Sequence, residues 1–163
     1  MSTILVVDAY NAIYAIPEVR LKMNESLERA RNSITLISKE YARSSGYIND
    51  IRVIFDGDDN YKYIDELNKN RKKHEIFSKT GDGDDEIIRT VRDCSKYARV
   101  VVASNDNYVR NIARGYGALI INSEELIKTK KRKKLFKEKK EDKKIDKSTE
   151  IKITNEYKKE LGL

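Results

Sequence analysis

The feature that most constrains this chain is a regular alternation of short apolar runs with stretches of helical periodicity. Residues 4–7 (ILVV) form a continuous apolar run, which is typical of a central parallel strand buried on both faces. Weaker β-rich runs lie at residues 51–55, 75–78, 99–103 and 118–121. Because strand and helix patterns alternate, we expect an α/β fold: a mainly parallel five-stranded sheet with helices on both faces and Asp8 on a central strand.

Helical patterns fill most of the intervals between these strands. Apolar residues recur at helical spacing over residues 27–41, 87–94 and 109–113, and Gly46 follows the first stretch as a stop signal. A polar stretch at residues 61–73 is also expected to be helical, with His74 at the surface of this basic helix. Pro17 is expected to shape a loop before residue 27, and Cys94 to be inert core. Ser123 predicts the N-cap of a last helix that continues into a basic segment.

Charge divides the chain into two parts. The 163 residues carry a net charge of +7, but residues 128–144 alone hold eleven Lys and Arg against three acids. We therefore expect a nearly neutral globular domain over residues 1–127 and a basic C-terminal helix and tail over residues 128–163. Such a segment is typical of nucleic-acid binding, although a solvated lysine-rich helix face gives the same pattern.

Composition excludes several classes of protein. A single cysteine excludes an intramolecular disulfide framework and a cysteine-based zinc site. No apolar run approaches the roughly 20 residues of a membrane span, and the first residues lack the pattern of a secretory signal. We expect a cytoplasmic protein with no membrane partner.

Acidic and polar side chains follow four of the five expected strands. Ligands bind beyond the carboxyl ends of strands in open α/β sheets, so these side chains should share one edge. They are Asp8 and Asn11 after the first strand, Asp56 after the second, Asp82, Asp84, Asp85 and Glu86 after the third, and Ser104, Asn105 and Asp106 after the fourth. Gathered carboxylates repel unless a cation offsets them, and hard oxygen ligands favour Mg²⁺ or Mn²⁺. The competing interpretation is that acids such as Asp84 and Asp106 only cap helices.

Four ordered segments carry a family resemblance: residues 4–11 (ILVVDAYN), 53–57 (VIFDG), 77–86 (FSKTGDGDDE) and 102–106 (VASND). Together they resemble the PIN-like NYN nucleases, most closely the YacP-like branch of ribosome-associated bacterial endoribonucleases. The resemblance covers about residues 3–128 and leaves the basic tail outside. It implies a three-layer PIN-like fold and metal-dependent hydrolysis of RNA, with mRNA at the ribosome as a candidate target.

The resemblance also implies roles for individual residues. Asp8, Asp85 and Asp106 would hold one or two Mg²⁺ or Mn²⁺ ions, with Asp56 either a ligand of a second metal or a residue that supports the ligands of the first. Asn11 would hydrogen-bond a phosphate oxygen or a metal-bound water. Accessory positions are Asp84, Glu86, Ser104 and Asn105. Nucleic-acid contacts are also expected from Tyr10 and Lys79 and, because of the charge of the basic segment rather than the resemblance, from Lys130, Lys131, Arg132, Lys133 and Lys134.

Three features leave alternatives open. The family usually has a small residue at the position of Asp84, and a one-residue shift of the last motif would put Asn105 rather than Asp106 at the metal. We prefer Asp106, because a carboxylate binds Mg²⁺ better than an amide does. Tyr10 and Tyr14 could stack on an unpaired base or pack against the helix at residues 27–41.

Rival functions are less consistent with these residues. A haloacid dehalogenase phosphatase needs a second Asp where this chain has Tyr10, and Lys79 is misplaced for a receiver domain. The serious alternative is a noncatalytic RNA- or ribosome-binding module with the same fold.

Overall fold

The computed structural model describes residues 1–56, 74–78 and 83–128 of the chain. Residues 1–127 form one compact unit, separate from residues 128–163, and the functional division drawn there stays a prediction. The expected helix at residues 61–73 lies outside the described residues. Among the helices that the structure describes, none is long and apolar enough to cross a membrane.

The described strands form one parallel five-stranded sheet, as the sequence predicts. The strands are β1 (Thr3–Asp8), β2 (Asp50–Phe55), β3 (Glu75–Phe77), β4 (Arg99–Ala103) and β5 (Leu119–Ile121). Their order is β3-β2-β1-β4-β5, so β1 is central and Asp8 ends the central strand. All four neighbouring pairs are parallel, which brings the carboxyl ends of the strands to one edge.

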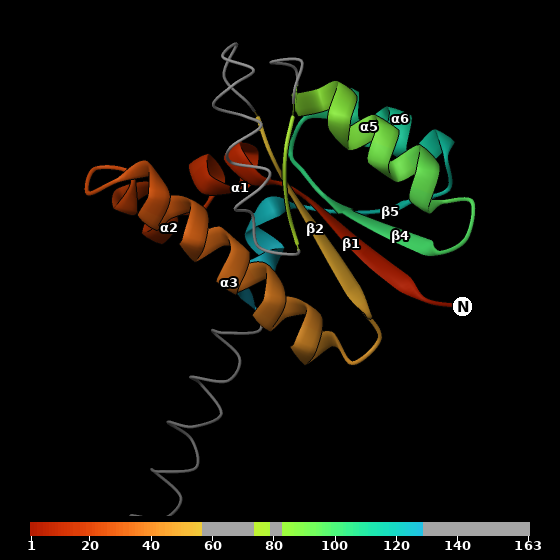
Figure 1. Cartoon of the computed structure of the whole chain (residues 1–163), viewed down its shortest axis with the longest axis horizontal. Helices are drawn as coiled ribbons and strands as arrows, with labels where there is room; N and C mark the ends of the chain where they lie inside the picture. Colours follow the sequence, from red (N-terminus) through yellow and green to blue (C-terminus); the bar gives the residue numbers. More distant parts are fainter. Residues whose placement is uncertain (57–73, 79–82, 129–163) are drawn as a thin grey trace, which may run out of the picture. The chain divides into compact units, whose positions relative to one another are not determined.

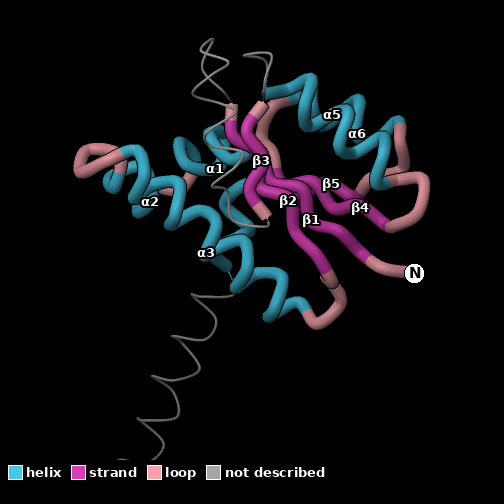
Figure 2. The backbone as a smooth tube through the Cα atoms, in the orientation of Figure 1, coloured by secondary structure: helices cyan, strands magenta, loops and turns pink. Residues whose placement is uncertain are grey.

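Helices cover both faces of this sheet (Figures 1 and 2). Their bounds are α1 (Ala9–Ala15), α2 (Pro17–Lys22), α3 (Leu27–Ser45), α5 (Gly83–Cys94), α6 (Asn107–Gly115) and the 3₁₀ helix η1 (Ser123–Ile127). The alternation of side chains along β1 explains the layering: Leu5 and Val7 pack with α1, α2, α3 and η1, whereas Ile4 and Val6 pack with α5 and α6. This pattern confirms the three-layer α/β fold.

Local sequence signals explain where α3 begins and ends. The Ser26 hydroxyl accepts a hydrogen bond from the Arg29 N–H at 3.1 Å, as an N-cap does. At the other end, Gly46 has a φ of 76°, a left-handed conformation that glycine adopts at little cost. The stop signal at Gly46 is therefore confirmed.

Two expectations about short segments are wrong. The segment before residue 27 is not a simple loop: it holds α1 and α2, and Pro17 is the first residue of α2, where its missing N–H costs nothing. Ser123 is not the N-cap of an α-helix but the first residue of the 3₁₀ helix η1. Its hydroxyl donates instead to Asn11, 112 residues away in the sequence.

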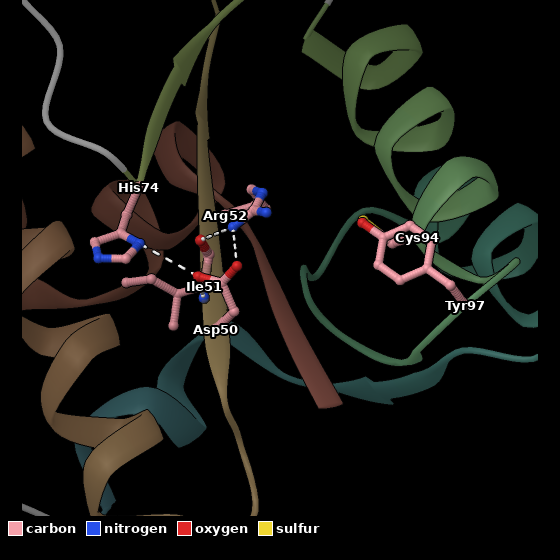
Figure 3. Close-up of polar contacts among 6 residues, drawn as sticks. All are labelled: Asp50, Ile51, Arg52, His74, Cys94 and Tyr97. Carbon is pink, nitrogen blue, oxygen red and sulfur yellow. Dashed lines mark hydrogen bonds and ion pairs between the residues drawn. The ribbon is translucent and has the colours of Figure 1, made fainter. Parts of the chain in front are cut away.

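His74 is also not on the surface of a basic helix. It lies in the turn before β3, its side chain is 26% exposed, and its Nδ1 is 3.4 Å from Asp50 Oδ1. Arg52 contacts the same carboxylate from the opposite side (Figure 3). Burial raises the pKa of Asp50. Hydrogen bonds from Arg52 and the Ile51 N–H, together with electrostatic attraction to Arg52 and His74, outweigh burial and hold this pKa below its usual value. Asp50, Arg52 and His74 lie where β2 and β3 begin, so this cluster is away from the edge where the strands end.

The single cysteine is buried, as its place on an apolar helix stripe predicts. Cys94 is 5% exposed at the end of α5, and the Tyr97 hydroxyl lies 3.5 Å from its sulfur (Figure 3). Its neighbours in the core are apolar residues of α5 and β4. The thiol is therefore a packing group.

Candidate active site

Three strands deliver polar side chains to the carboxyl edge of the sheet. Asp8 is the last residue of β1, Asp56 follows β2, and Ser104 follows β4. Figure 1 shows α1 and the start of α5 at this end of the sheet. We call this edge, with Asp8, Asn11, Asp56, Asp84, Ser104 and Asp106, the acidic rim.

Ser104 connects two acids of the rim. Its hydroxyl donates to Asp8 Oδ2 at 2.9 Å and accepts the Asp106 N–H at 3.1 Å. Ser104 is fully buried, so both hydrogen bonds of its hydroxyl are sheltered from water. Asp106 is the N-cap of α6, because its Oδ1 accepts the Val109 N–H at 3.1 Å. The capping interpretation of Asp106 is thus correct, and it is compatible with a second role for the same carboxylate.

The carboxyl group of Asp8 is strongly perturbed. Burial is the largest cause, and it raises the pKa of Asp8 from 3.8 to about 6. The hydrogen bond from Ser104 and one involving the Asn11 backbone lower this pKa, whereas the negative charges of Asp84 and Asp106 raise it. A carboxylate held among like charges and away from water is a frequent sign of a functional site.

The first turn of α5 contributes acids that differ in their surroundings. Asp84 is half-buried and acts on Asp8 through its charge, whereas Asp85, one residue later, is exposed. Glu86 forms an ion pair with Arg89 on the same helix. These differences follow from helix geometry, because successive residues point about 100° apart.

Asn11 joins the rim to η1. Its Oδ1 accepts two hydrogen bonds, one from the Asn105 N–H and one from the Ser123 hydroxyl, both at 2.9 Å. Asn105 Oδ1 in turn accepts the Ser123 N–H at 3.0 Å, and Asn105 Nδ2 donates to Glu124 at 3.0 Å. Because both donors meet Oδ1, the Asn11 amide has a fixed orientation, and its Nδ2 group is the one available to donate elsewhere.

Asp56 packs closely against the start of α5. A Cβ atom at Gly83 would lie 3.3 Å from both Cβ and Cγ of Asp56, so a glycine fits there with the least displacement. The Ser78 hydroxyl lies 3.4 Å from Asp56 Oδ1. The Asp56 side chain is exposed, and its backbone is fixed by the end of β2.

The residues expected to contact nucleic acid are only partly described. Tyr10 is half-buried: its hydroxyl accepts hydrogen bonds from Arg31 of α3, and its ring meets Phe55 edge-on at 5.9 Å. Of the two alternatives for this tyrosine, the packing contact with residues 27–41 is present. Tyr14 is 58% exposed. Lys79, Lys130, Lys131, Arg132, Lys133 and Lys134 lie outside the described residues.

The donor chemistry of the rim suits a hard divalent cation, since carboxylate, amide and hydroxyl oxygens are the ligands that Mg²⁺ and Mn²⁺ prefer. Over residues 1–56, 74–78 and 83–128, no three Asp, Glu, His or Cys side chains are close enough together to hold a metal ion. The repulsion of the Asp8 carboxylate by Asp84 and Asp106 is nevertheless what a bound cation would relieve. Asp8, Asp84 and Asp106 are therefore the acids whose charges a bound ion would offset, and Asp56 follows the neighbouring strand β2 at the same edge.

Some elements of the site could not be found by inspecting the sequence. Ser123 contacts Asn11 of the rim, and Glu124 and Arg31 contact Asn105 and Tyr10 beside it, across 19 to 112 positions of the chain. Nothing in their local sequence marks them. Gly83 was visible only as one of the glycines in a loop.

A parallel sheet with an acidic carboxyl edge, covered by helices on both faces, is the arrangement expected of the PIN-like nuclease fold that the sequence resembles. A family model, the YacP-like NYN domain, matches residues 5–162, and the chain belongs to this family. Its members are generally nucleases that use divalent metals. The match includes the basic segment, so the expectation that residues beyond 128 fall outside the resemblance is wrong.

A solved structure supports the assignment. The chain is similar to the crystal structure of a mutant of Rae1 (YacP) from Bacillus subtilis, with a TM-score of 0.61 and 26% sequence identity. The similarity covers 91% of this chain and 84% of the Rae1 chain. No curated protein matches the sequence.

Proposed function

We propose that this protein is a metal-dependent endoribonuclease whose catalytic residues are the acids of the rim. The observation that carries the proposal is the environment of Asp8: a buried carboxyl group at the end of the central strand, with a raised pKa and two acids acting on it. Because the chain belongs to a nuclease family, we interpret this carboxylate as a metal ligand of a nuclease site. A group so placed is suited to binding a cation and through it a phosphodiester.

Each rim residue has a part in this proposal. Asp8 and Asp106 bind the metal, with a third carboxylate from the first turn of α5. Family resemblance favours Asp85 for that position, whereas the electrostatic coupling with Asp8 supports Asp84. Ser104 holds the Asp8 carboxylate in place through its hydrogen bond at 2.9 Å. Asn11 presents its Nδ2 group to a phosphate oxygen, because its Oδ1 is already occupied.

When bound, Mg²⁺ or Mn²⁺ would activate a water molecule and neutralise charge on the phosphate oxygens. The chain supplies the binding and the orientation. Buried Ser104 fixes the Asp8 carboxylate, and two hydrogen bonds to Oδ1 fix the Asn11 amide. These side chains therefore need little reorganisation when RNA binds. Asp56 is a further metal ligand in this scheme.

The proposal is tested by cleavage of an end-labelled single-stranded RNA. Wild-type protein should cut in Mg²⁺ or Mn²⁺ and not in EDTA, and Asp8→Asn should lose most of the activity. Asp93→Asn is the matched control, because Asp93 is an exposed acid on α5 that pairs with Lys96. If wild type and Asp8→Asn are equally inactive but bind RNA, the chain is the noncatalytic RNA-binding module instead.

Action on mRNA at the ribosome and a cytoplasmic location are finer proposals. The first rests on family resemblance and the second on cysteine content. Adding ribosomes and a translated mRNA to the same cleavage assay tests the first: the rate of mRNA cleavage should rise in the presence of translation.

A further inference from the structure

Arg31 has an unusual environment for a surface arginine. Its guanidinium donates from Nε and Nη2 to the Tyr10 hydroxyl, at 3.1 and 2.8 Å. The same group lies 5.3 Å from the centre of the Phe77 ring and 6.0 Å from those of Tyr10 and Phe55. Phe55 and Phe77 stack at 5.0 Å, so the cation rests on a preformed aromatic surface.

The charge of Arg31 is not offset by an acid within the described part of the chain. Elsewhere on or beside α3, arginines pair with glutamates: Arg29 with Glu25 and Arg43 with Glu40. A guanidinium has five N–H donors. Within the described structure, Arg31 donates from Nε and Nη2, and both hydrogen bonds go to the hydroxyl oxygen of Tyr10. The side chain is half-buried, so the remaining donors can reach a ligand.

The aromatic surface beneath Arg31 is joined to the acidic rim. Tyr10 is two residues after Asp8, and Phe55 immediately precedes Asp56. Phe77 is the last residue of β3 and, like Phe55, belongs to the core on the α1–α3 side. Arg31 is therefore near the carboxyl edge of the sheet, on the face opposite α5.

We propose that Arg31 binds a backbone phosphate of the RNA strand next to the one being cleaved. This inference rests on the proposed function and extends it by adding a substrate-binding residue. A planar guanidinium matches a phosphate with two parallel hydrogen bonds. Its stacking on Phe55 and Phe77 and its bonds to Tyr10 fix its orientation before RNA binds, which lowers the entropy cost of binding.

The test compares Arg31→Met with Arg43→Met, both in an Asp8→Asn background so that the RNA stays intact. Methionine keeps an apolar stem over the aromatic rings and removes the charge, and Arg43 is an exposed arginine on the same helix. The probe is a short fluorescent single-stranded oligoribonucleotide, with binding measured by anisotropy over a range of salt concentrations. Melting temperatures establish that each variant is folded.

Arg31→Met should weaken binding about tenfold at low salt and reduce the salt slope by about 0.7, the value for one single-strand phosphate that is no longer neutralised. Arg43→Met should change neither. Arg31→Lys should keep the slope but bind severalfold more weakly, because a point charge replaces the bidentate group. A folded Arg31→Met with the affinity and slope of Arg43→Met overturns the proposal and leaves Arg31 a packing residue.

The same proteins with Asp8 restored separate this inference from the proposed function. In that background, Arg31→Met should raise KM more than it lowers kcat. If wild type cleaves RNA but Arg31→Met and Arg43→Met have equal KM, only the role of Arg31 fails. If no protein cleaves RNA but the difference in binding is present, the nuclease proposal fails and the phosphate contact stands.

Discussion

Replacing Asp8 by Asn should stabilise the protein without metal, by an amount that depends on pH. The pKa of Asp8 is about 6 in the folded chain against an ordinary 3.8. Each pKa unit corresponds to about 1.4 kcal/mol, so the ionised group costs the folded state about 3 kcal/mol. Asparagine keeps an oxygen that can accept the Ser104 hydrogen bond and removes the charge that burial, Asp84 and Asp106 oppose.

The sign of the pH dependence follows from proton binding. Between about pH 4 and 6 the folded state holds the Asp8 proton and the unfolded state does not, so unfolding releases a proton. Stability of the wild type therefore falls as pH rises through this window. Asp8→Asn should give almost no gain below pH 4 and the full gain above pH 7, with the midpoint of the change between the two pKa values.

The assay is thermal unfolding followed by circular dichroism in EDTA, at intervals from pH 4 to pH 8. A gain of about 3 kcal/mol corresponds to a rise in Tm of roughly 6–12 °C for a chain of this size. Asp93→Asn is the control: hydrogen bonds from Arg92 and Lys96 hold the pKa of Asp93 below its usual value, so its replacement should not raise Tm at pH 8. A gain for Asp8→Asn that is absent, or equal at pH 4 and pH 8, would refute the reasoning.

Two further predictions concern the periphery of the rim and the basic segment. Ser123→Ala removes one of the two hydrogen bonds to Asn11 Oδ1 and should lower kcat about tenfold, in line with roughly 1–1.5 kcal/mol for one bond. The control is Ser95→Ala, because the Ser95 hydroxyl has no hydrogen-bond partner in the described structure. Equal kcat values for the two variants would show that Asn11 needs no support from η1. A second variant replaces five residues of the basic segment by Gln: Lys130, Lys131, Arg132, Lys133 and Lys134. It should bind RNA more weakly and reduce the salt slope by about 0.7 for each phosphate that these residues neutralise, with little change in Tm. An unchanged slope would mean that these residues form a solvated face.

Much of the fold was readable from the sequence because its signals are local. The run at residues 4–7 marks the central strand, and the alternation of patterns predicts the parallel sheet, whose order then brings Asp8 and the turn after β4 to one edge. The pairing of Ser104 with Asp8 follows from that register, since β1 and β4 are neighbours. Position in a parallel sheet is thus enough to predict which residues share an edge.

What the sequence could not supply depends on side-chain direction and on distant contacts. The choice between Asp84 and Asp85 is a matter of about 100° of helix rotation, which the spacing of residues does not fix. The bond from Ser123 to Asn11 spans 112 positions, and a serine followed by glutamates is typical of a helix cap, so the local pattern favoured the wrong structure. The position of Arg31 over three aromatic rings likewise depends on tertiary packing.

The most direct test of the central claim is the identity of the ends that the protein leaves on RNA. Hydrolysis by an activated water at the acidic rim should give products without a 2′,3′-cyclic phosphate, in Mg²⁺ or Mn²⁺, from wild type and not from Asp8→Asn. Mass spectrometry of the cut oligonucleotides reads these ends directly. Cyclic phosphate ends, or the same products in equal yield from Asp8→Asn, would contradict a metal-dependent nuclease centred on Asp8.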